Sequence, residues 1–123
     1  MPADRDADSA AAQDCLFCTI IAGDIDADLV HQSERSLAFR DVNPQAPTHV
    51  LVVPRAHHRD VGALAGADPQ GLADLVAVAT TVAEREGLDG WRVVFNTGAE
   101  AGQSVFHCHA HVLGGRTLDW PPG

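Results

Sequence analysis

The segment QSVFHCHAHVL, residues 103–113, places three histidines two residues apart within an apolar run. A two-residue period is that of a β-strand, whose successive side chains point to opposite faces. His107, His109 and His111 are therefore predicted to share one face of a strand. The residues predicted to point the other way, into a core, are Phe106, Cys108, Ala110 and Val112.

Such a row of imidazoles indicates chemistry rather than packing. Histidine can act near neutral pH as a nucleophile, a proton donor or a metal ligand, and a strand holds its side chains in fixed positions. We therefore predict that this segment carries a catalytic or binding site.

The length and composition fit one globular domain. A chain of 123 residues, 46% of them hydrophobic, can bury a core of its own, and we predict a single domain over residues 14–123. Residues 1–13 are charged and alanine-rich without the apolar core of a secretory signal, so a disordered leader is expected there. The odd number of cysteines, three, argues against a disulfide scaffold and favours the reducing cytoplasm.

The charge of the chain limits its partners. A net charge of −9 with no lysine leaves no continuous basic face for a nucleic acid, and no apolar run is long enough to cross a membrane. A small anion stays a candidate ligand, because backbone N–H groups and histidines hold a phosphate without a basic surface.

Short elements precede the histidines. Residues 15–22 suit one or two helical turns, and residues 29–31 and 36–40 suit two short strands at hairpin-like spacing. Residues 50–53, VLVV, form an apolar run that ends at Pro54. Such a run predicts a strand buried on both faces in the middle of a sheet.

One long helix and a further strand complete the expected topology. Asp68 and Pro69 form a helix start, apolar residues keep helical spacing to residue 82, and Gly87 ends the helix. This helix should cover one face of the sheet and leave the other for a site or a partner. Residues 91–95 predict a strand that the glycine-containing turn 96–102 returns antiparallel to the histidine strand.

The chain resembles the histidine-triad (HIT) family of nucleotide hydrolases and transferases, whose signature is three histidines alternating with hydrophobic residues. Beyond 102–113, GQSVFHCHAHVL, the resemblance includes 37–49, LAFRDVNPQAPTH, and the tail from 114–116, GGR, through 120–123, WPPG. These last segments look like the Hint branch, the purine nucleoside phosphoramidases. The resemblance implies an α+β fold with about five antiparallel strands and one long helix in each subunit, and a sheet that continues across a homodimer.

The resemblance also implies a reaction. His109 attacks the α-phosphorus of an adenosine 5'-phosphoramidate, and water resolves the nucleotidyl-histidine to AMP. The main-chain carbonyl of His107 orients the His109 ring, while His111 and Ser104 contact the phosphate and the leaving amine. The residues implied to complete the phosphate cradle are Asn96 and the backbone of Gly102, Gln103 and Ser104.

The nucleoside side of the expected site combines a carboxylate with apolar residues. Asp41 would accept hydrogen bonds from the ribose hydroxyls, although an aspartate before residues 43–44, NP, is as readily a turn former. His49 matches a further family histidine that supports the triad. In the Hint branch the tail lies near the partner's active site, so Trp120 is expected to shape the choice of leaving group. The apolar residues expected to line the base pocket are Ile20, Phe39 and Val42.

A second motif indicates zinc. Cys15 and Cys18 have the C-x-x-C spacing that lets two thiolates bind one tetrahedral zinc, and His57 or His58 together with His107 would complete four ligands. The resemblance to zinc-binding bacterial HIT proteins implies His57 for the third position. A redox pair and two buried thiols are the alternatives.

Three residues depart from the family pattern. Cys108 and Ala110 stand where relatives often carry larger residues, which alters packing and leaves the histidine face unchanged. Ala101 replaces a glycine common in the preceding turn, and this replacement is expected to restrict the phosphate loop and lower turnover.

These observations predict a dimeric, phosphoramidase-like nucleotide hydrolase, with adenosine favoured over guanosine by family precedent. Two other functions stay open. One is a metallohydrolase in which strand histidines and a further ligand such as a carboxylate chelate a catalytic zinc. The other is a nucleotide-responsive binding module that turns over little and acts through a protein partner.

Overall fold

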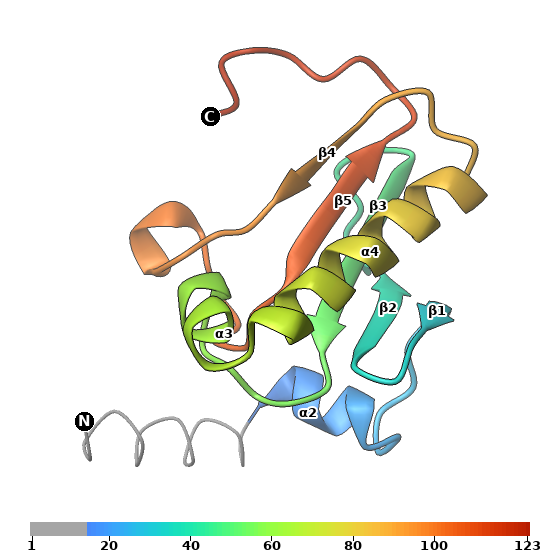
Figure 1. The fold of residues 1–123 in the computed structure, drawn as a ribbon. Helices are drawn as coiled ribbons and strands as arrows, with labels where there is room; N and C mark the ends of the chain where they lie inside the picture. The colour runs from blue at the N-terminus through green and yellow to red at the C-terminus, as the bar shows by residue number, and fades with distance from the viewer. Residues whose placement is uncertain (1–14) are drawn as a thin grey trace.

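The computed structural model describes residues 15–123, so the leader predicted over 1–13 lies outside the described residues. Within the described range, five strands form one antiparallel sheet in the order β1-β2-β3-β5-β4, with helices packed around it (Figure 1). The strands are β1 (Leu29–Gln32), β2 (Ser36–Arg40), β3 (Thr48–Pro54), β4 (Trp91–Val94) and β5 (Ala110–Gly114). The helices are α2 (Leu16–Ile21), α3 (Val61–Ala67) and α4 (Pro69–Arg85), and a 3₁₀ turn covers Ala99–Ala101. The predicted α+β architecture is confirmed.

Strand β3 occupies the middle of the sheet, as its apolar run predicts. All of its residues are buried, and it pairs with β2 on one side and β5 on the other. The hairpin expected from β1 and β2 is present, and β4 lies antiparallel to β5 at the outer edge. Among residues 15–123, no helix is both long and apolar enough to cross a membrane.

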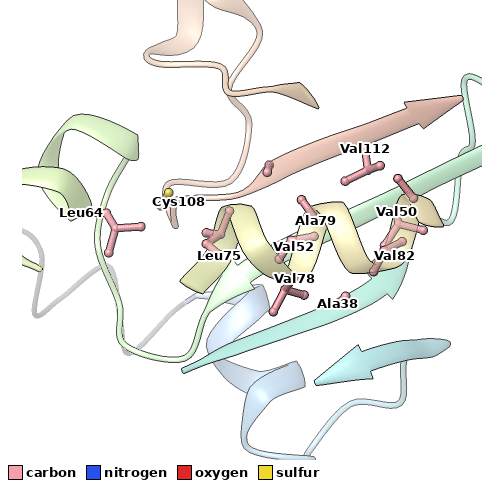
Figure 2. Packing of buried hydrophobic residues seen from close by; sticks show 12 residues of the cluster. Ala38, Val50, Val52, Leu64, Leu75, Val78, Ala79, Val82, Cys108 and Val112 are labelled. Atoms are coloured by element: carbon pink, nitrogen blue, oxygen red, sulfur yellow. The ribbon is translucent and has the colours of Figure 1, made fainter. Parts of the chain in front are cut away.

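Helix α4 covers one face of the sheet. It begins at Pro69, and the carboxylate of the N-cap Asp68 accepts the Gly71 N–H at 3.0 Å. Its buried stripe packs with side chains from three strands and from the histidine segment (Figure 2). The core positions expected for Cys108, Ala110 and Val112 are confirmed, since each is at most 1% exposed.

Helix α2 packs on the opposite face. Because alternate residues of a strand point to opposite sides, Leu51 and Val53 face α2, while Val50 and Val52 face α4. The second cluster consists of Cys15, Phe17, Leu37, Phe39, Leu51 and Val53. This short helix therefore brings the cysteine motif against the middle of the sheet.

The histidine segment is not one continuous strand. Strand β5 begins only at Ala110, and Phe106 is 41% exposed rather than part of the core. The three residues before β5 that are buried in succession are His107, Cys108 and His109. Their backbone leaves the sheet because the Cys108 N–H donates to the carbonyl of His58 at 2.6 Å instead of to a neighbouring strand. The prediction of strict alternation over 103–113 is therefore wrong.

Candidate active site and metal centre

Strand pairing places two histidines on the sheet face that α4 leaves uncovered. Residues directly opposite each other in an antiparallel pair point to the same side. Leu51 of β3 lies opposite Phe39 of β2 and His111 of β5, and His49 precedes Leu51 by two residues. Because Leu51 and Phe39 belong to the cluster under α2, His49 and His111 share that face.

His109 is held in one orientation. Its Nδ1–H donates to the main-chain carbonyl of His107 at 2.8 Å, and Phe17 packs edge-on against the ring with centroids 5.0 Å apart. A carbonyl only accepts, so the neutral ring carries its proton on Nδ1 and keeps a lone pair on Nε2. Burial lowers the pKa of His109, which keeps the ring neutral near pH 7. His109 therefore has the protonation state of a nucleophile.

A chain of hydrogen bonds fixes the protons of His49 and His111. The backbone N–H of Gln45 donates to His49 Nδ1 at 3.0 Å, which leaves the proton of neutral His49 on Nε2. This Nε2 lies 2.8 Å from His111 Nδ1, so His49 donates and His111 accepts. Burial lowers the pKa of His111 to about 4, so the ring is neutral at pH 7 with its proton on Nε2. His111 can therefore donate that proton to a ligand.

Asp41 takes part in both a turn and the site. Its Oδ1 accepts the Asn43 N–H at 2.8 Å, so the turn-forming role is present. Its Oδ2 lies 3.5 Å from His49 Nε2, and the side chain is 18% exposed in the wall of a cavity. One carboxylate oxygen thus stays available to a ligand.

This cavity has a volume of about 420 Å³ and is lined mainly by apolar side chains. Phe17 and Leu51 connect it to the histidines, because Phe17 packs on His109 and Leu51 lies opposite His111. The predicted base-pocket residues that lie in its wall are Ile20, Phe39 and Val42. The sequence prediction missed Phe17 and Leu51. Phe17 lies three residues before Ile20, which is the spacing that puts both on one side of a helix, and this was the usable signal.

The loop before the histidines is shaped by two glycines. Gly98 and Gly102 have φ angles of 87° and 98°, in the left-handed region that glycine tolerates best. A Cβ added at Gly102 would lie 3.9 Å from Asn96 Nδ2, so the Asn96 amide faces this loop, and Ser104 is exposed beside it. No non-glycine residue in 15–123 has a positive φ, so Ala101 introduces no backbone strain, and the lower turnover expected from it stays a prediction.

Gln103 points into the protein rather than toward a ligand. Its side chain is buried, with Nε2 donating to the carbonyls of Arg59 at 2.8 Å and Val105 at 3.1 Å. Its Oε1 accepts the Gly98 N–H at 2.8 Å, and its own N–H donates to the Gly98 carbonyl at 3.1 Å. Both groups are bonded within the protein, and the phosphate contact expected of the Gln103 backbone stays a prediction.

Four metal-ligating side chains meet where α2 approaches the histidine segment. Their donor atoms all lie within 4.8 Å of one another. The four residues are Cys15, Cys18, His57 and His107. The cysteine spacing left His57 and His58 as alternative ligands, and the structure places His57 in the cluster. The backbone carbonyl of His58 instead accepts a hydrogen bond from the Cys108 N–H.

The cluster has the dimensions of a zinc site. His107 Nε2–H donates to the Pro54 carbonyl at 2.8 Å, which leaves Nδ1 unprotonated and facing the other donors. This Nδ1 lies 3.3 Å from Cys15 Sγ and 3.5 Å from Cys18 Sγ. It lies 3.2 Å from His57 Nδ1. A tetrahedral zinc with nitrogen ligands at about 2.0 Å and sulfur ligands at about 2.3 Å has N–S edges of about 3.5 Å and N–N edges of about 3.3 Å.

The cysteines differ in environment. Burial raises the pKa of Cys18 to about 11 and that of Cys108 to about 12, so both are thiols unless a metal displaces the proton. Cys108 lies in the core beneath α4, far from solvent, and acts as a small apolar residue. Burial also lowers the pKa of His107 to about 4, which keeps its Nδ1 lone pair ready for a metal.

Trp120 stands at the outer edge of the histidine face. Arg92 of β4 lies opposite Leu113 and so shares that face, and its guanidinium carbon is 5.9 Å from the Trp120 ring centroid. Arg92 Nη2 also donates to the Asp119 carbonyl at 2.8 Å, which holds the tail beside β4. The Trp120 side chain is 81% exposed, so most of the ring is open to a partner.

Known proteins share this architecture. A model of the HIT domain matches residues 22–118, and the chain belongs to the HIT domain family. It is 45% identical to a HIT family hydrolase from Legionella pneumophila, with a TM-score of 0.85 over 89% of this chain and 99% of that chain. A HIT family hydrolase from Clostridium thermocellum is 39% identical, with a TM-score of 0.82 over 85% of this chain and 93% of that one. The chain therefore has the fold of the HIT family hydrolases.

Two similar sequences extend the comparison. A 14 kDa zinc-binding protein of Zea mays is 48% identical over 112 residues, covering 88% of this chain and 87% of that protein. An uncharacterized HIT-like protein of Synechocystis is 46% identical over 113 residues, covering 91% of this chain and 99% of that protein. The resemblance to the HIT family is thus confirmed over most of the chain.

The low pKa of His111 predicts a loss of stability in acid. The His111 pKa is about 6.5 in the unfolded chain and about 4 in the folded protein. Between these values the unfolded chain binds more protons, so the free energy of unfolding falls as the pH falls. Relative to a His111→Gln variant, the wild-type protein should lose about 2 kcal/mol more between neutral pH and about pH 4.5.

Urea unfolding at a series of pH values measures this difference. Release of a bound metal in acid is common to both proteins, so the comparison isolates His111. Parallel pH profiles for the two proteins would show that His111 is not held neutral by burial.

Proposed function

We propose that the protein is a Hint-like phosphoramidase that hydrolyses adenosine 5'-phosphoramidates to AMP and an amine through a nucleotidyl-His109 intermediate. The observation that carries this proposal is the pair formed by His109, with a free Nε2 lone pair, and His111, with a proton on Nε2, beside an apolar cavity. A nucleophile and an acid adjoining a pocket for an aromatic base are what P–N bond cleavage requires.

Substrate binding follows from the chemistry of the pocket walls. The base lies in the apolar cavity against Ile20, Phe39 and Val42, and the ribose hydroxyls donate to Asp41 Oδ2. The phosphate lies against the loop that bears the polar groups still open to a ligand. These are the Asn96 amide, the Ser104 hydroxyl and the backbone around Gly102.

The reaction proceeds in two displacements. His109 Nε2 attacks the α-phosphorus and forms a P–N bond to the ring, while the bond from phosphorus to the amine breaks. The His111 Nε2–H gives its proton to the departing nitrogen, and a proton from solvent replaces it on the same ring nitrogen, while the His49 Nε2–H stays bonded to His111 Nδ1 and holds the ring. The ring of His109 gains positive charge, which its Nδ1–H bond to the His107 carbonyl stabilises.

Water completes the cycle. Its oxygen bonds to phosphorus, one of its protons is released to solvent, and the bond from phosphorus to His109 breaks. The electron pair of that bond returns to His109 Nε2, so the ring is again neutral and AMP is released.

A structural zinc is part of the proposal. Cys15, Cys18, His57 and His107 would hold it, and when bound the metal supplies a cross-link between α2 and the histidine segment. The same His107 that offers Nδ1 to the cluster uses its carbonyl to orient His109. The name of the zinc-binding relative from Zea mays supports this assignment.

A metallohydrolase is the second candidate, because Asp41, His49 and His111 also offer donors within 4.8 Å of one another. The 2.8 Å bond between His49 Nε2 and His111 Nδ1 places a proton where a metal would need two lone pairs. This arrangement favours a hydrogen-bonded histidine pair over chelation.

The stereochemistry at phosphorus distinguishes the two candidates. An adenosine phosphoramidate chiral at the α-phosphorus should be hydrolysed with retention, because each of two displacements inverts the centre. Direct attack by a metal-bound water inverts it once. Inversion, together with complete loss of turnover in folded, chelated protein, would contradict the proposed mechanism; AMP binding without any turnover would identify a binding module instead.

A homodimer is proposed through the free edge of β4. This strand is outermost in the sheet, and its Trp91 and Val93 are 38% and 37% exposed. Sheet continuation across such an edge buries apolar side chains and satisfies its backbone groups. We further propose that residues 14–123 act as one HIT domain in the cytoplasm, where the three free cysteines stay reduced.

Truncation after Leu118 tests the role of the tail. We expect Trp120 to reach the leaving-group side of the partner's site, so the truncated protein should rank phosphoramidates of different amines differently while keeping His109 chemistry. Relative kcat/KM values for a small and a bulky amine should change by about tenfold. An unchanged ranking and unchanged dimer stability would mean that the tail plays no part in recognition.

A further inference from the structure

The Gln103 carboxamide is a buried connection between two parts of the chain that are distant in sequence. It is 4% exposed and uses both N–H groups and its oxygen in hydrogen bonds. The amide can be placed in only one way, because its Nε2 faces two carbonyls and its Oε1 faces an N–H. A fully satisfied buried amide fixes the geometry of every group that it joins.

One side of this connection is the loop that the proposed reaction uses for the phosphate. Gln103 joins Gly98 twice, once through its side chain and once through its backbone N–H, and so closes the loop. Asn96 faces this loop, and Ser104 follows Gln103 directly. The positions of these polar groups therefore depend on where the Gln103 side chain is anchored.

The other side is the segment that follows β3. Within it, His57 belongs to the metal cluster, the His58 carbonyl accepts the Cys108 N–H, and the Arg59 carbonyl accepts the Gln103 Nε2–H. Three successive residues thus face the metal cluster, the histidine segment and the phosphate loop. A shift of His57 on metal binding would move the Arg59 carbonyl, to which the loop is bonded.

We propose that Gln103 is a positioning residue that couples the metal cluster to the phosphate loop, so that zinc at His57 strengthens phosphate binding and phosphate strengthens zinc retention. The reciprocity is a thermodynamic requirement of any such coupling. This inference rests on the proposed function, since it takes the loop to bind the nucleotide phosphate.

The test compares the binding of AMP with that of adenosine in the wild-type protein and three variants. Gln103→Met removes the side-chain hydrogen bonds and keeps a side chain of similar size. Gln103→Glu keeps an acceptor for the Gly98 N–H but replaces the Nε2 donor with a carboxylate oxygen, which two carbonyls would repel. Gln32→Glu is the matched control, because within residues 15–123 the Gln32 side chain uses its oxygen alone, as acceptor from the exposed Arg55 Nη2. The Gln103 variants should lose about 10- to 100-fold in AMP affinity, while adenosine affinity, which needs no phosphate contact, changes less than about twofold.

Zinc retention gives a second readout that does not depend on activity. In the wild-type protein, saturating AMP should slow the loss of zinc to a chelator, and adenosine should not. In Gln103→Met this effect of AMP should disappear although zinc is still bound at the start. If Gln103→Glu fails to fold, Gln103→Met alone decides the question.

The outcomes separate this inference from the proposed function. Equal losses of AMP and adenosine affinity, or zinc retention that responds to AMP alike in wild type and variant, would overturn the role of Gln103. A wild-type protein that binds no zinc would also overturn the coupling. Failure of the wild-type protein to form a nucleotidyl-histidine would instead overturn the proposed reaction. AMP affinity would then still measure how well the loop binds a phosphate.

Discussion

Replacing His109 with alanine is expected to lower the hydrolysis of an adenosine phosphoramidate by about 10⁴-fold or more, because the substitution removes the nucleophile. AMP binding should stay within about tenfold of the wild-type affinity, since the cavity walls and Asp41 are unchanged. Steady-state kinetics and calorimetric titration with AMP measure the two effects separately.

A matched variant makes the comparison specific to the site. His31 lies outside the site and is hydrogen-bonded to Arg85, the last residue of α4. The His31→Ala variant should therefore keep the wild-type rate. Wild-type turnover by His109→Ala, in protein shown to be free of contaminating hydrolase, would show that His109 is not the nucleophile.

Joint replacement of Cys15 and Cys18 by serine should abolish zinc binding and strongly destabilise the fold. Purified wild-type protein should contain about one zinc per subunit, because the four donors have the spacing of a tetrahedral site. Loss of the cross-link between α2 and the histidine segment should lower the melting temperature by about 10 °C or more. Metal content by elemental analysis and melting by circular dichroism give both values.

Cys108 provides the control for removal of a thiol. It lies in the α4 cluster outside the metal site, so Cys108→Ala should retain zinc and lose only the stability that a small core cavity costs, about 1 kcal/mol.

Absence of zinc from wild-type protein made in zinc-replete medium would show that the four residues do not form a zinc site. Partial turnover after chelation is expected, because no step of the reaction uses the metal.

The fold was predictable where local pattern and burial agree. The run in β3 is buried on both faces, and the start of α4 at Asp68 and Pro69 has both a side-chain cap and a proline suited to a first turn. Helix α3 was not predicted, since Gly62 and Gly66 weaken its helical propensity and only Leu64 is buried. Its N-cap, Asp60, was the signal that could have located it.

The site was predictable in its residues and less so in its geometry. The spacing of the histidines and of the two cysteines pointed to the residues that the structure brings together, but the alternation expected of the histidines failed. The backbone there bonds to the His58 carbonyl, which is distant in sequence, and no local pattern encodes such a bond. The protons on His49 and His111 likewise depend on the Gln45 N–H and on packing across strands.

Rapid mixing with an adenosine phosphoramidate, acid-free quenching and intact-protein mass spectrometry test the central claim most directly. The proposed mechanism predicts a protein heavier by one adenylyl group, with the group mapped to His109 and absent from the His109→Ala variant. The adduct should form no more slowly than AMP is released. Steady production of AMP with no adduct at any time, or an adduct that persists in His109→Ala, would contradict the account.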